Sequence, residues 1–258
     1  MQDLKVGILQ FDQAWEDKQE NISRINMHLK GKSGFDILLL PEMFHTGFTM
    51  NHEAHAEKMH SSLGIEFLQE LSSRLKCSVY TSLIIKEKDK VYNRGVLVSG
   101  EEITYYDKRK CFGMSGEDKH FTAGKKEIIK KLLGWNINLQ ICYDLRFPEL
   151  IRNKLLDNKT AKYDVLLYVA NWPKKRISHW KKLLQARAIE NQCFVVGCNR
   201  TGLDGNGIEY TGNSVTVDPS GKLIEPVLKD GTQGVSITTF NYETLVAFRK
   251  KLPFLQDY

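Results

Sequence analysis

The chain has 258 residues, 41% of them hydrophobic and 26% charged, with a formal net charge of +6. This length and composition suffice for a sizeable core and exclude disordered, collagenous and coiled-coil proteins. The charge is modest, no basic stripe alternates with aromatic residues, and no apolar run approaches the roughly 20 residues of a membrane span, so neither nucleic acid nor a membrane is an expected partner. The N-terminal residues show no secretory pattern, and the five cysteines form no Cys-x-x-Cys pair and read as free thiols, so we expect a cytoplasmic protein.

Strand-like and helix-like segments alternate along the first half of the chain. Short apolar runs predict strands, and apolar residues spaced three or four apart predict helices. Ser61 or Ser62 is a candidate cap for a helix that carries Phe67 and Leu71 on its apolar face. A hairpin is predicted at Ser99-Gly100. The expected strands are 4–11, 35–41, 79–86, 91–99 and 101–106, and the expected helices are 21–30 and 63–75.

The second half of the chain continues this alternation without a repeat, a low-complexity tract or a linker. We therefore predict a single α/β domain over residues 1–258. Glycines between residues 202 and 207 follow a strand but open no helix, which argues against a phosphate-binding loop. The expected strands are 135–142, 163–171, 193–199, 209–218, 222–228 and 234–240, and the expected helices are 147–156 and 178–191.

Three reactive side chains follow predicted strands at their carboxyl ends. Glu42 comes just after the strand that ends at Pro41, Lys108 follows Tyr106-Asp107, and Cys142 follows Ile141. Ligand crevices form at strand ends in sheets flanked by helices, so these side chains are candidates for one site. Each one alone also has an ordinary structural interpretation, as a solvated turn residue, a solvated lysine or a small core residue.

Together, the three residue types make a set that can cleave an amide. A thiolate is a nucleophile, but a free thiol with a pKa of about 8.5 is only slightly ionised near neutrality. A carboxylate in a pocket can take the thiol proton and later deliver one to the leaving amine. A fixed ammonium and a backbone N–H can stabilise the oxyanion that develops.

Histidine is the usual alternative base, and a Cys/His pair stays open at this point. His45 and His120 lie close in sequence to the candidate site segments, so either could line the pocket. His52 and His55 are spaced like metal ligands, but no second ligand cluster accompanies them, so we expect neither a metal nor a cofactor.

Five stretches make the chain resemble the nitrilase, or carbon–nitrogen hydrolase, superfamily. They occur in the order that the superfamily shows, and the likeness extends over essentially the whole chain. The octapeptide that begins at Cys142 is the most specific of them. The stretches are Leu40-Pro41-Glu42-Met43-Phe44, Tyr106-Asp107-Lys108-Arg109, Cys142-Tyr143-Asp144-Leu145-Arg146-Phe147-Pro148-Glu149, Ala170-Asn171-Trp172-Pro173 and Ala186-Arg187-Ala188-Ile189-Glu190-Asn191-Gln192.

This resemblance implies a four-layer αββα sandwich and a Glu–Lys–Cys triad, which maps to Glu42, Lys108 and Cys142. It also implies a thioester intermediate, with the oxyanion held by Lys108 and the backbone N–H of Tyr143. Glu117 falls where many members have a second glutamate. The superfamily commonly forms dimers, so a homodimer is expected. We expect Cys142→Ala and Lys108→Ala each to abolish turnover and leave the fold intact.

Within the superfamily, the segments after Glu42 and around Cys142 resemble the bacterial ω-amidases. Those enzymes hydrolyse the terminal amide of 2-oxoglutaramate or 2-oxosuccinamate to the 2-oxo diacid and ammonia. The alternative is another small-molecule amidase or an N-carbamoyl amino-acid hydrolase. A non-catalytic relative is disfavoured by the intact triad, and an acyltransferase by the lack of membrane segments. One departure from the relatives is Lys110-Cys111, where they typically have histidine and leucine.

Several residues beside the triad have two interpretations. Arg146 could bind a substrate carboxylate or form an ion pair with Asp144 or Glu149, and the ion pair is the favoured expectation. Trp172 and Phe44 could each form a wall of the pocket, next to Tyr143, or belong to the core. Three further expectations concern structure alone: Arg187 and Glu190 form a helical pair, Cys193 and Cys198 lie in core strands, and Cys111 is a second thiol near Lys108.

Overall fold

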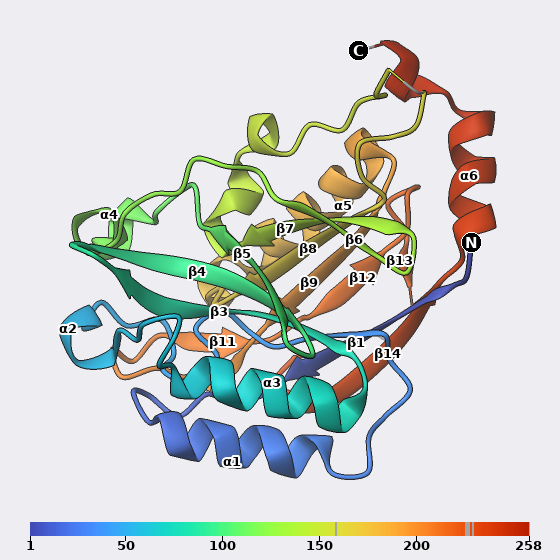
Figure 1. Ribbon diagram of the computed structural model, residues 1–258. Coiled ribbons are helices and arrows are strands. Elements are labelled where there is room, and N and C mark those ends of the chain that lie inside the picture. Colours follow the sequence, from blue (N-terminus) through green and yellow to red (C-terminus); the bar gives the residue numbers. More distant parts are fainter. Residues whose placement is uncertain (158, 225–227, 229, 258) are drawn as a thin grey trace.

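The structure is a computed structural model that describes residues 1–157, 159–224, 228 and 230–257. Two six-stranded sheets form its centre (Figure 1). The first sheet contains β14 (Gly234–Phe240), β1 (Leu4–Gln10), β2 (Ile37–Leu39), β3 (Ser78–Glu87), β4 (Lys90–Ser99) and β5 (Glu102–Asp107), in that order. The second contains β13 (Leu223–Ile224), β12 (Val215–Val217), β9 (Phe194–Asn199), β8 (Val165–Ala170), β7 (Trp135–Ile141) and β6 (Ile129–Leu132).

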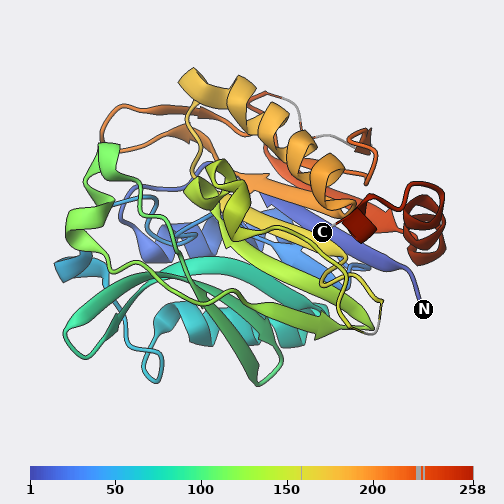
Figure 2. The same ribbon diagram turned by 90° about the horizontal axis from the view of Figure 1, so that it is seen from above.

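Helices cover the outer faces of both sheets. Figure 1 shows α1 (Lys18–Leu29) and α3 (Leu63–Leu75) side by side on the first sheet, and the view from above in Figure 2 shows α5 (Ile177–Asn191) on the far side of the second. Helix α6 (Tyr242–Lys251) lies at one edge, near the N-terminus. The order helix, sheet, sheet, helix confirms the predicted αββα sandwich. Two four-residue helices, α2 (His52–His55) and α4 (Glu117–His120), lie in loops.

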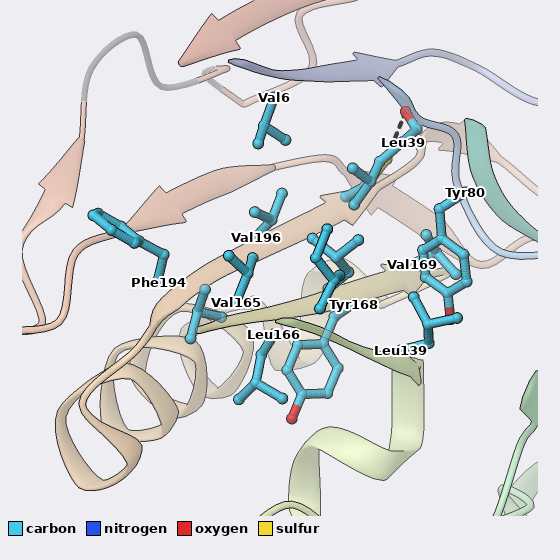
Figure 3. Packing of buried hydrophobic residues seen from close by; sticks show 14 of the residues in the cluster. Val6, Leu39, Tyr80, Leu139, Val165, Leu166, Tyr168, Val169, Phe194 and Val196 are labelled. Carbon is cyan, nitrogen blue, oxygen red and sulfur yellow. Dashed lines mark hydrogen bonds between the residues drawn. The ribbon is translucent and has the colours of Figure 1, made fainter. Parts of the chain in front are cut away.

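The main core lies between the two sheets. Figure 3 shows Val6 and Leu39 of the first sheet pointing toward Val165 and Val196 of the second, whereas Tyr168 points away from the first sheet. This alternation follows from the two-residue period of a strand, and because both faces of the second sheet are covered, β8 is apolar along its whole length. A second core cluster joins α1 and α3 to the outer face of the first sheet.

Polar side chains cap the N-terminal ends of the two helices on the first sheet, α1 and α3. Ser62, one of the two candidate caps, accepts a hydrogen bond from the backbone N–H of Ile65 and begins α3. Asp17 caps α1 in the same way, by accepting from the backbone N–H of Glu20. This helix therefore begins at Lys18, three residues before its predicted start. The hairpin at Ser99-Gly100 is confirmed, because Ser99 pairs with Glu102 in the antiparallel β4–β5 ladder.

Two predicted elements in the second half of the chain are wrong. The helix expected over 147–156 is only a short 3₁₀ turn, Pro148–Leu150, because further on the backbone N–H of Asn153 donates to Oδ1 of Asn191 and its side chain donates to the carbonyls of Tyr163 and Asn191. The strand expected over 209–218 divides into β11 (Glu209–Thr211) and β12, because Gly212 and Asn213 both have positive φ angles.

Other differences concern short or weakly patterned segments. The predicted strand 222–228 is observed as β13, and residues 225–227 lie outside the described residues. Strand β6 and helix α6 were not predicted, because β6 has only four residues and α6 buries only Leu245. β11 pairs with β10 (Thr201–Leu203) in a separate two-stranded hairpin. No helix in the described part of the chain is long and apolar enough to span a membrane.

Parallel pairing brings the candidate site residues toward one edge of the sandwich. β1, β2 and β3 run parallel in the first sheet, and β7, β8 and β9 run parallel in the second. The loops that leave the carboxyl ends of β2 and β7 carry Glu42 and Cys142, and Asn171 follows β8. The fold therefore supplies reactive groups to one site from both sheets.

Candidate active site

Glu42, Lys108 and Cys142 lie together where the two sheets meet. The Nζ atom of Lys108 is 2.9 Å from Oε1 of Glu42, and both side chains are almost completely buried. Sγ of Cys142 lies 4.0 Å from the backbone carbonyl oxygen of Asn171, and the charges of Glu42 and Lys108 both act on this thiol. The structure thus brings the three predicted side chains into one cluster, although they are separated in sequence by up to 100 residues.

Glu117 joins the same cluster from α4. Both of its carboxylate oxygens are 2.9 Å from Nζ of Lys108, and its Oε2 accepts a hydrogen bond from the backbone N–H of Phe112 at 2.5 Å. The lysine therefore lies between two buried carboxylates. Although burial lowers the pKa of Lys108, Glu117 and Glu42 together raise it well above its usual range, so the amine stays charged.

Two asparagines complete the surroundings of Glu42. Nδ2 of Asn93, on β4, donates to Oε1 of Glu42 at 2.8 Å and to Oε1 of Glu117 at 3.0 Å. The backbone N–H of Asn171 donates to Oε2 of Glu42 at 2.9 Å, and its side-chain amide donates to the Glu42 backbone carbonyl. Both oxygens of the Glu42 carboxylate are consequently held by fixed donors.

Cys142 stands at a sharp turn between β7 and a 3₁₀ turn over Cys142–Arg146. Its φ angle is +43°, in the left-handed region that residues other than glycine rarely adopt, and such strain clusters at functional sites. Burial raises the pKa of the thiol well above its usual range, Glu42 raises it further, and Lys108 opposes this. The thiol is therefore protonated at neutral pH, and it needs an adjacent base to become a nucleophile.

A cavity of about 550 Å³ opens onto Cys142. Six aromatic side chains form part of its wall, and Glu42, Lys108 and Glu117 lie outside its lining, deeper in the protein. A concave, mostly apolar cavity with a few polar groups is typical of a small-molecule site. The lining residues used below are Trp15, Phe48, Phe112, Cys142, Tyr143, Arg146, Asn171, Trp172, Arg176, Asp204 and Tyr210.

Two guanidinium groups lie in the cavity wall without an acidic partner among the described residues. Arg146 lies over the Trp172 ring at 4.8 Å and contacts Nδ1 of His179 at 3.3 Å, and Arg176 lies over the Phe112 ring at 5.3 Å. The carboxylate of Asp204 in the same cavity is already engaged by Tyr210 and two backbone N–H groups. The cavity wall is therefore suited to an anionic group on a ligand.

Three of the four residues that were predicted to bind substrate line the cavity, and one does not. Tyr143, Trp172 and Arg146 line the cavity. Phe44 does not, because it is fully buried and stacks on Phe67 of α3 in the second core cluster, so its interpretation as a pocket wall is wrong. The ion pair favoured for Arg146 is also wrong.

Asp144, one partner proposed for that ion pair, instead accepts hydrogen bonds from the Tyr106 hydroxyl and the backbone N–H of Lys110. Arg187 and Glu190 do form the expected pair, at 3.0 Å. Cys198 is buried in β9, and Cys193 is buried just before that strand.

No histidine lines the cavity in the described part of the chain. His45 is buried and contacts Glu57 at 3.3 Å, and the ring of His120 lies against that of His52. Glu42, whose charge acts on the Cys142 thiol, is therefore the candidate base, and the structure gives no support to a Cys/His pair.

The departure at Lys110-Cys111 lies beside the cavity and outside its lining. The Nζ atom of Lys110 is 4.6 Å from the centre of the Phe147 ring. Cys111 is half-buried, packs near Met43 and Phe121, and burial raises the pKa of its thiol to about 12. The structure shows no contact of Cys111 with Cys142.

Several cavity and cluster residues were not predicted as site residues. Asn171 belongs to the family-like stretch Ala170-Asn171-Trp172-Pro173, and its position directly after a strand could have marked it as a site residue. Asn93 lies in the middle of a strand, and Arg176 and Tyr210 lie in segments without a local pattern that marks a site. Phe48 lies in the segment after Glu42 that resembles the ω-amidases, but nothing there marks it individually. Only the fold brings these four residues to the cluster or the cavity.

Comparison with known proteins places this geometry in a family. A family model described as carbon-nitrogen hydrolase matches residues 5–250. The chain is 41% identical to "Omega-amidase YafV" of Yersinia enterocolitica, over all of this chain and 97% of that protein. It is 31% identical to "2-oxoglutaramate amidase" of Bacillus subtilis (strain 168), over 98% of this chain and 96% of that one. The crystal structure of XC1258 from Xanthomonas campestris, described as a CN-hydrolase superfamily protein, superimposes with a TM-score of 0.96 at 33% identity, covering 100% of this chain and 98% of that chain.

Proposed function

Because the chain belongs to the carbon–nitrogen hydrolase family and is therefore a hydrolase acting on amides, we propose that it is an ω-amidase. Its substrate is a small 2-oxo acid amide, 2-oxoglutaramate or 2-oxosuccinamate, and its products are the 2-oxo diacid and ammonia. The relatives named above support the substrate class, since one of them is a 2-oxoglutaramate amidase.

One observation carries the proposal. The thiol of Cys142 lines a mostly apolar cavity and feels the charges of the buried Glu42–Lys108–Glu117 cluster, while two guanidinium groups without acidic partners among the described residues lie in the wall of the same cavity. The first feature fits amide cleavage, and the second fits a substrate that carries a carboxylate. An amide without an anionic group would leave Arg146 and Arg176 unused.

The first half-reaction converts the amide into a thioester. Glu42 accepts the Sγ proton of Cys142 as the sulfur attacks the amide carbon, so the carbonyl oxygen becomes an oxyanion. Lys108 Nζ and the backbone N–H of Tyr143 stabilise that oxyanion. The proton held by Glu42 then passes to the amide nitrogen, the C–N bond breaks, and ammonia leaves.

The second half-reaction restores the enzyme. Glu42, again a carboxylate, accepts a proton from water while the water oxygen attacks the thioester carbon. A second oxyanion forms at the same position and collapses as the C–S bond breaks. The Cys142 sulfur leaves as a thiolate and regains its proton from Glu42, and the acid product departs. Glu117 keeps Lys108 charged and fixed through both steps.

Substrate orientation depends on the two arginines. We assign the substrate carboxylate to Arg146 and Arg176, whose guanidinium groups lie over the rings of Trp172 and Phe112 at 4.8 and 5.3 Å. Stacking leaves the edge of a guanidinium free to donate two parallel hydrogen bonds to a carboxylate. Arg146→Leu should therefore raise KM for a 2-oxo acid amide more than it lowers kcat.

The deciding experiment measures ammonia release. The wild type, Cys142→Ala and Cys77→Ala are assayed with 2-oxoglutaramate, 2-oxosuccinamate, glutamine, asparagine and an N-carbamoyl amino acid. Cys77 is a matched control, because it is 7% exposed and Cys142 is 9% exposed, but it lies away from the cavity. Turnover of the 2-oxo amides alone, lost only in Cys142→Ala, supports the proposal. Activity on the carbamoyl compound alone would move the enzyme to the alternative function, and turnover by Cys142→Ala would refute the nucleophile.

A further inference from the structure

We propose that Asn93 is a positioning residue for the reaction: its side-chain amide holds Glu42 and Glu117 as a pair of ionised carboxylates around Lys108. This inference deepens the proposed function and rests on it for the role of Glu42 as the base. Asn93 lies in the middle of β4, is 1% exposed, and is not part of the cavity lining. It therefore acts through other residues and does not touch substrate.

Asn93 contacts every charged member of the cluster. The two hydrogens on Nδ2 are used on two different carboxylates, Glu42 at 2.8 Å and Glu117 at 3.0 Å. Its backbone carbonyl accepts from the backbone N–H of Lys108 at 3.0 Å. One residue on one strand thus sets the positions of a carboxylate from the β2 loop, a carboxylate from α4 and the lysine that follows β5.

The charge balance of the cluster explains why an amide is needed there. Glu42 and Glu117 are 0% exposed, and Lys108, the cation that both contact, is 1% exposed. Two buried carboxylates beside one ammonium leave an excess of negative charge in a region shielded from water. A neutral group that donates to both carboxylates offsets this excess without adding a charge. A protonated Glu42 could not accept the thiol proton of Cys142.

The orientation of the amide supports a specific role. Oδ1 of Asn93 is buried and has no hydrogen-bond partner among the described residues. Leaving a buried acceptor unpaired costs stability, and an apolar side chain at this strand position would avoid that cost. The opposite amide orientation would place Oδ1 against two carboxylate oxygens, which repel it. The asparagine therefore makes its two donor hydrogen bonds, although its acceptor oxygen stays without a partner.

The other titratable groups around the cluster do not supply such donors. Cys142 and Cys111 have raised pKa values because they are buried, so both are neutral thiols at neutral pH. Burial also raises the pKa of Tyr80. Burial raises the pKa of Asp144 to about 6, but this side chain bonds to the Tyr106 hydroxyl and to the backbone N–H groups of Ile141 and Lys110, and not to Glu42 or Glu117.

The test compares Asn93→Leu with a matched control, Asn138→Leu. Asn138 is a fully buried strand asparagine whose Nδ2 also donates to a carboxylate, Glu127 at 2.8 Å, but outside this cluster. Two profiles are measured from pH 5 to 9: kcat for ammonia release, and the rate at which iodoacetamide labels Cys142, followed by mass spectrometry. In Asn93→Leu the acid limb of both profiles should move up by about one pH unit, the size expected when a carboxylate loses a hydrogen bond. KM should stay within about twofold, because the cavity is untouched.

Several outcomes are distinguishable. An acid limb that stays in place, or moves equally in Asn138→Leu, overturns the proposal and leaves Asn93 a structural residue. If Asn93→Leu does not fold, Asn93→Ser replaces it, because one hydroxyl hydrogen cannot serve both carboxylates and a smaller upward shift is expected. If the wild type turns over none of the amides, the proposed function fails, while the labelling profile still tests the effect of Asn93 on Cys142.

Discussion

Lys108 lies between two carboxylates that are as deeply buried as itself. The sequence predicts that removal of Lys108 abolishes turnover and leaves the fold intact. The burial of Lys108 and its two partners changes the expectation for the stability of the fold. Lys108→Met should abolish turnover and also lower the free energy of unfolding by about 3–5 kcal/mol, because two buried charges lose their counter-ion. Urea denaturation at pH 7 measures this. Lys110→Met, which removes a half-buried lysine two residues further on, should cost less than about 1 kcal/mol, and an equal loss in both variants would contradict the prediction.

The thiols of Cys142 and Cys111 should respond differently to pH. Burial raises the pKa of Cys111 to about 12, so between pH 6 and 9 its reactive thiolate should increase about tenfold per pH unit. Cys142 can pass its proton to Glu42, so its rate should rise less steeply. The ratio of Cys142 to Cys111 labelling by iodoacetamide should therefore fall as pH rises. Equal slopes for the two thiols would argue against Glu42 as the base.

The residues that could be predicted are those with a local signal. Glu42, Lys108 and Cys142 each follow a strand that is visible in the sequence, and their residue types are complementary. Asn93 has no such signal, since it faces the cluster only through the register of β3, β4 and β5. The sequence left Phe44 open between cavity wall and core, because an aromatic residue close to Glu42 can point either way and only the packing against α3 decides.

The start of α3 combines a helix cap with a buried carboxylate. Ser62 accepts from Ile65 and donates to Oε2 of Glu57, and it is 1% exposed. Ser62→Ala should lower the free energy of unfolding by about 2 kcal/mol, because it removes the cap and leaves Glu57 short of a donor. Asn241, an exposed cap at the start of α6, is the control, and Asn241→Ala should cost about 1 kcal/mol or less. Equal losses in urea titrations would show that the bond to Glu57 contributes nothing.

The β10–β11 hairpin forms one wall of the cavity and depends on a glycine. Gly202 has a φ angle of +87°, and a Cβ atom there would lie 1.8 Å from Oδ1 of Asp12, which pairs with Arg200. Gly202→Ala should displace the hairpin and raise KM several-fold, with a smaller effect on kcat. Gly207 has a similar φ of +72° but open space around it, so Gly207→Ala should only cost about 1–2 kcal/mol of backbone strain. Unchanged KM in Gly202→Ala would mean that this wall does not contact substrate.

Elements with strong patterns were predictable, and those set by distant contacts were not. The apolar runs of β2, β7 and β8 and the cap of α3 mark those elements in the sequence. The segment after Pro148 looks helical, yet its backbone is held by Asn191 at the end of α5, 38 residues away from Asn153. A local sequence pattern cannot predict a contact between residues so far apart in the chain.

For the whole molecule, the αββα architecture and the membership in the carbon–nitrogen hydrolase family agree with the sequence analysis. The single-domain organisation, the homodimer and the cytoplasmic location stay predictions from the sequence and its resemblance. Strand β14 returns to the first sheet and pairs with β1, so the two ends of the chain meet in one sheet and the second sheet is inserted between them.

The residues of the proposed site come from both sheets: Glu42 and Lys108 follow strands of the first, and Cys142 and Asn171 follow strands of the second. During refolding, a chain that has formed either sheet alone holds only part of the set, and long-range pairings such as β1 with β14 form slowly. Catalysis returns only when the sheets have docked face to face in the correct alignment. The time course of recovered activity therefore reports the docking step, whereas circular dichroism reports the formation of the sheets themselves.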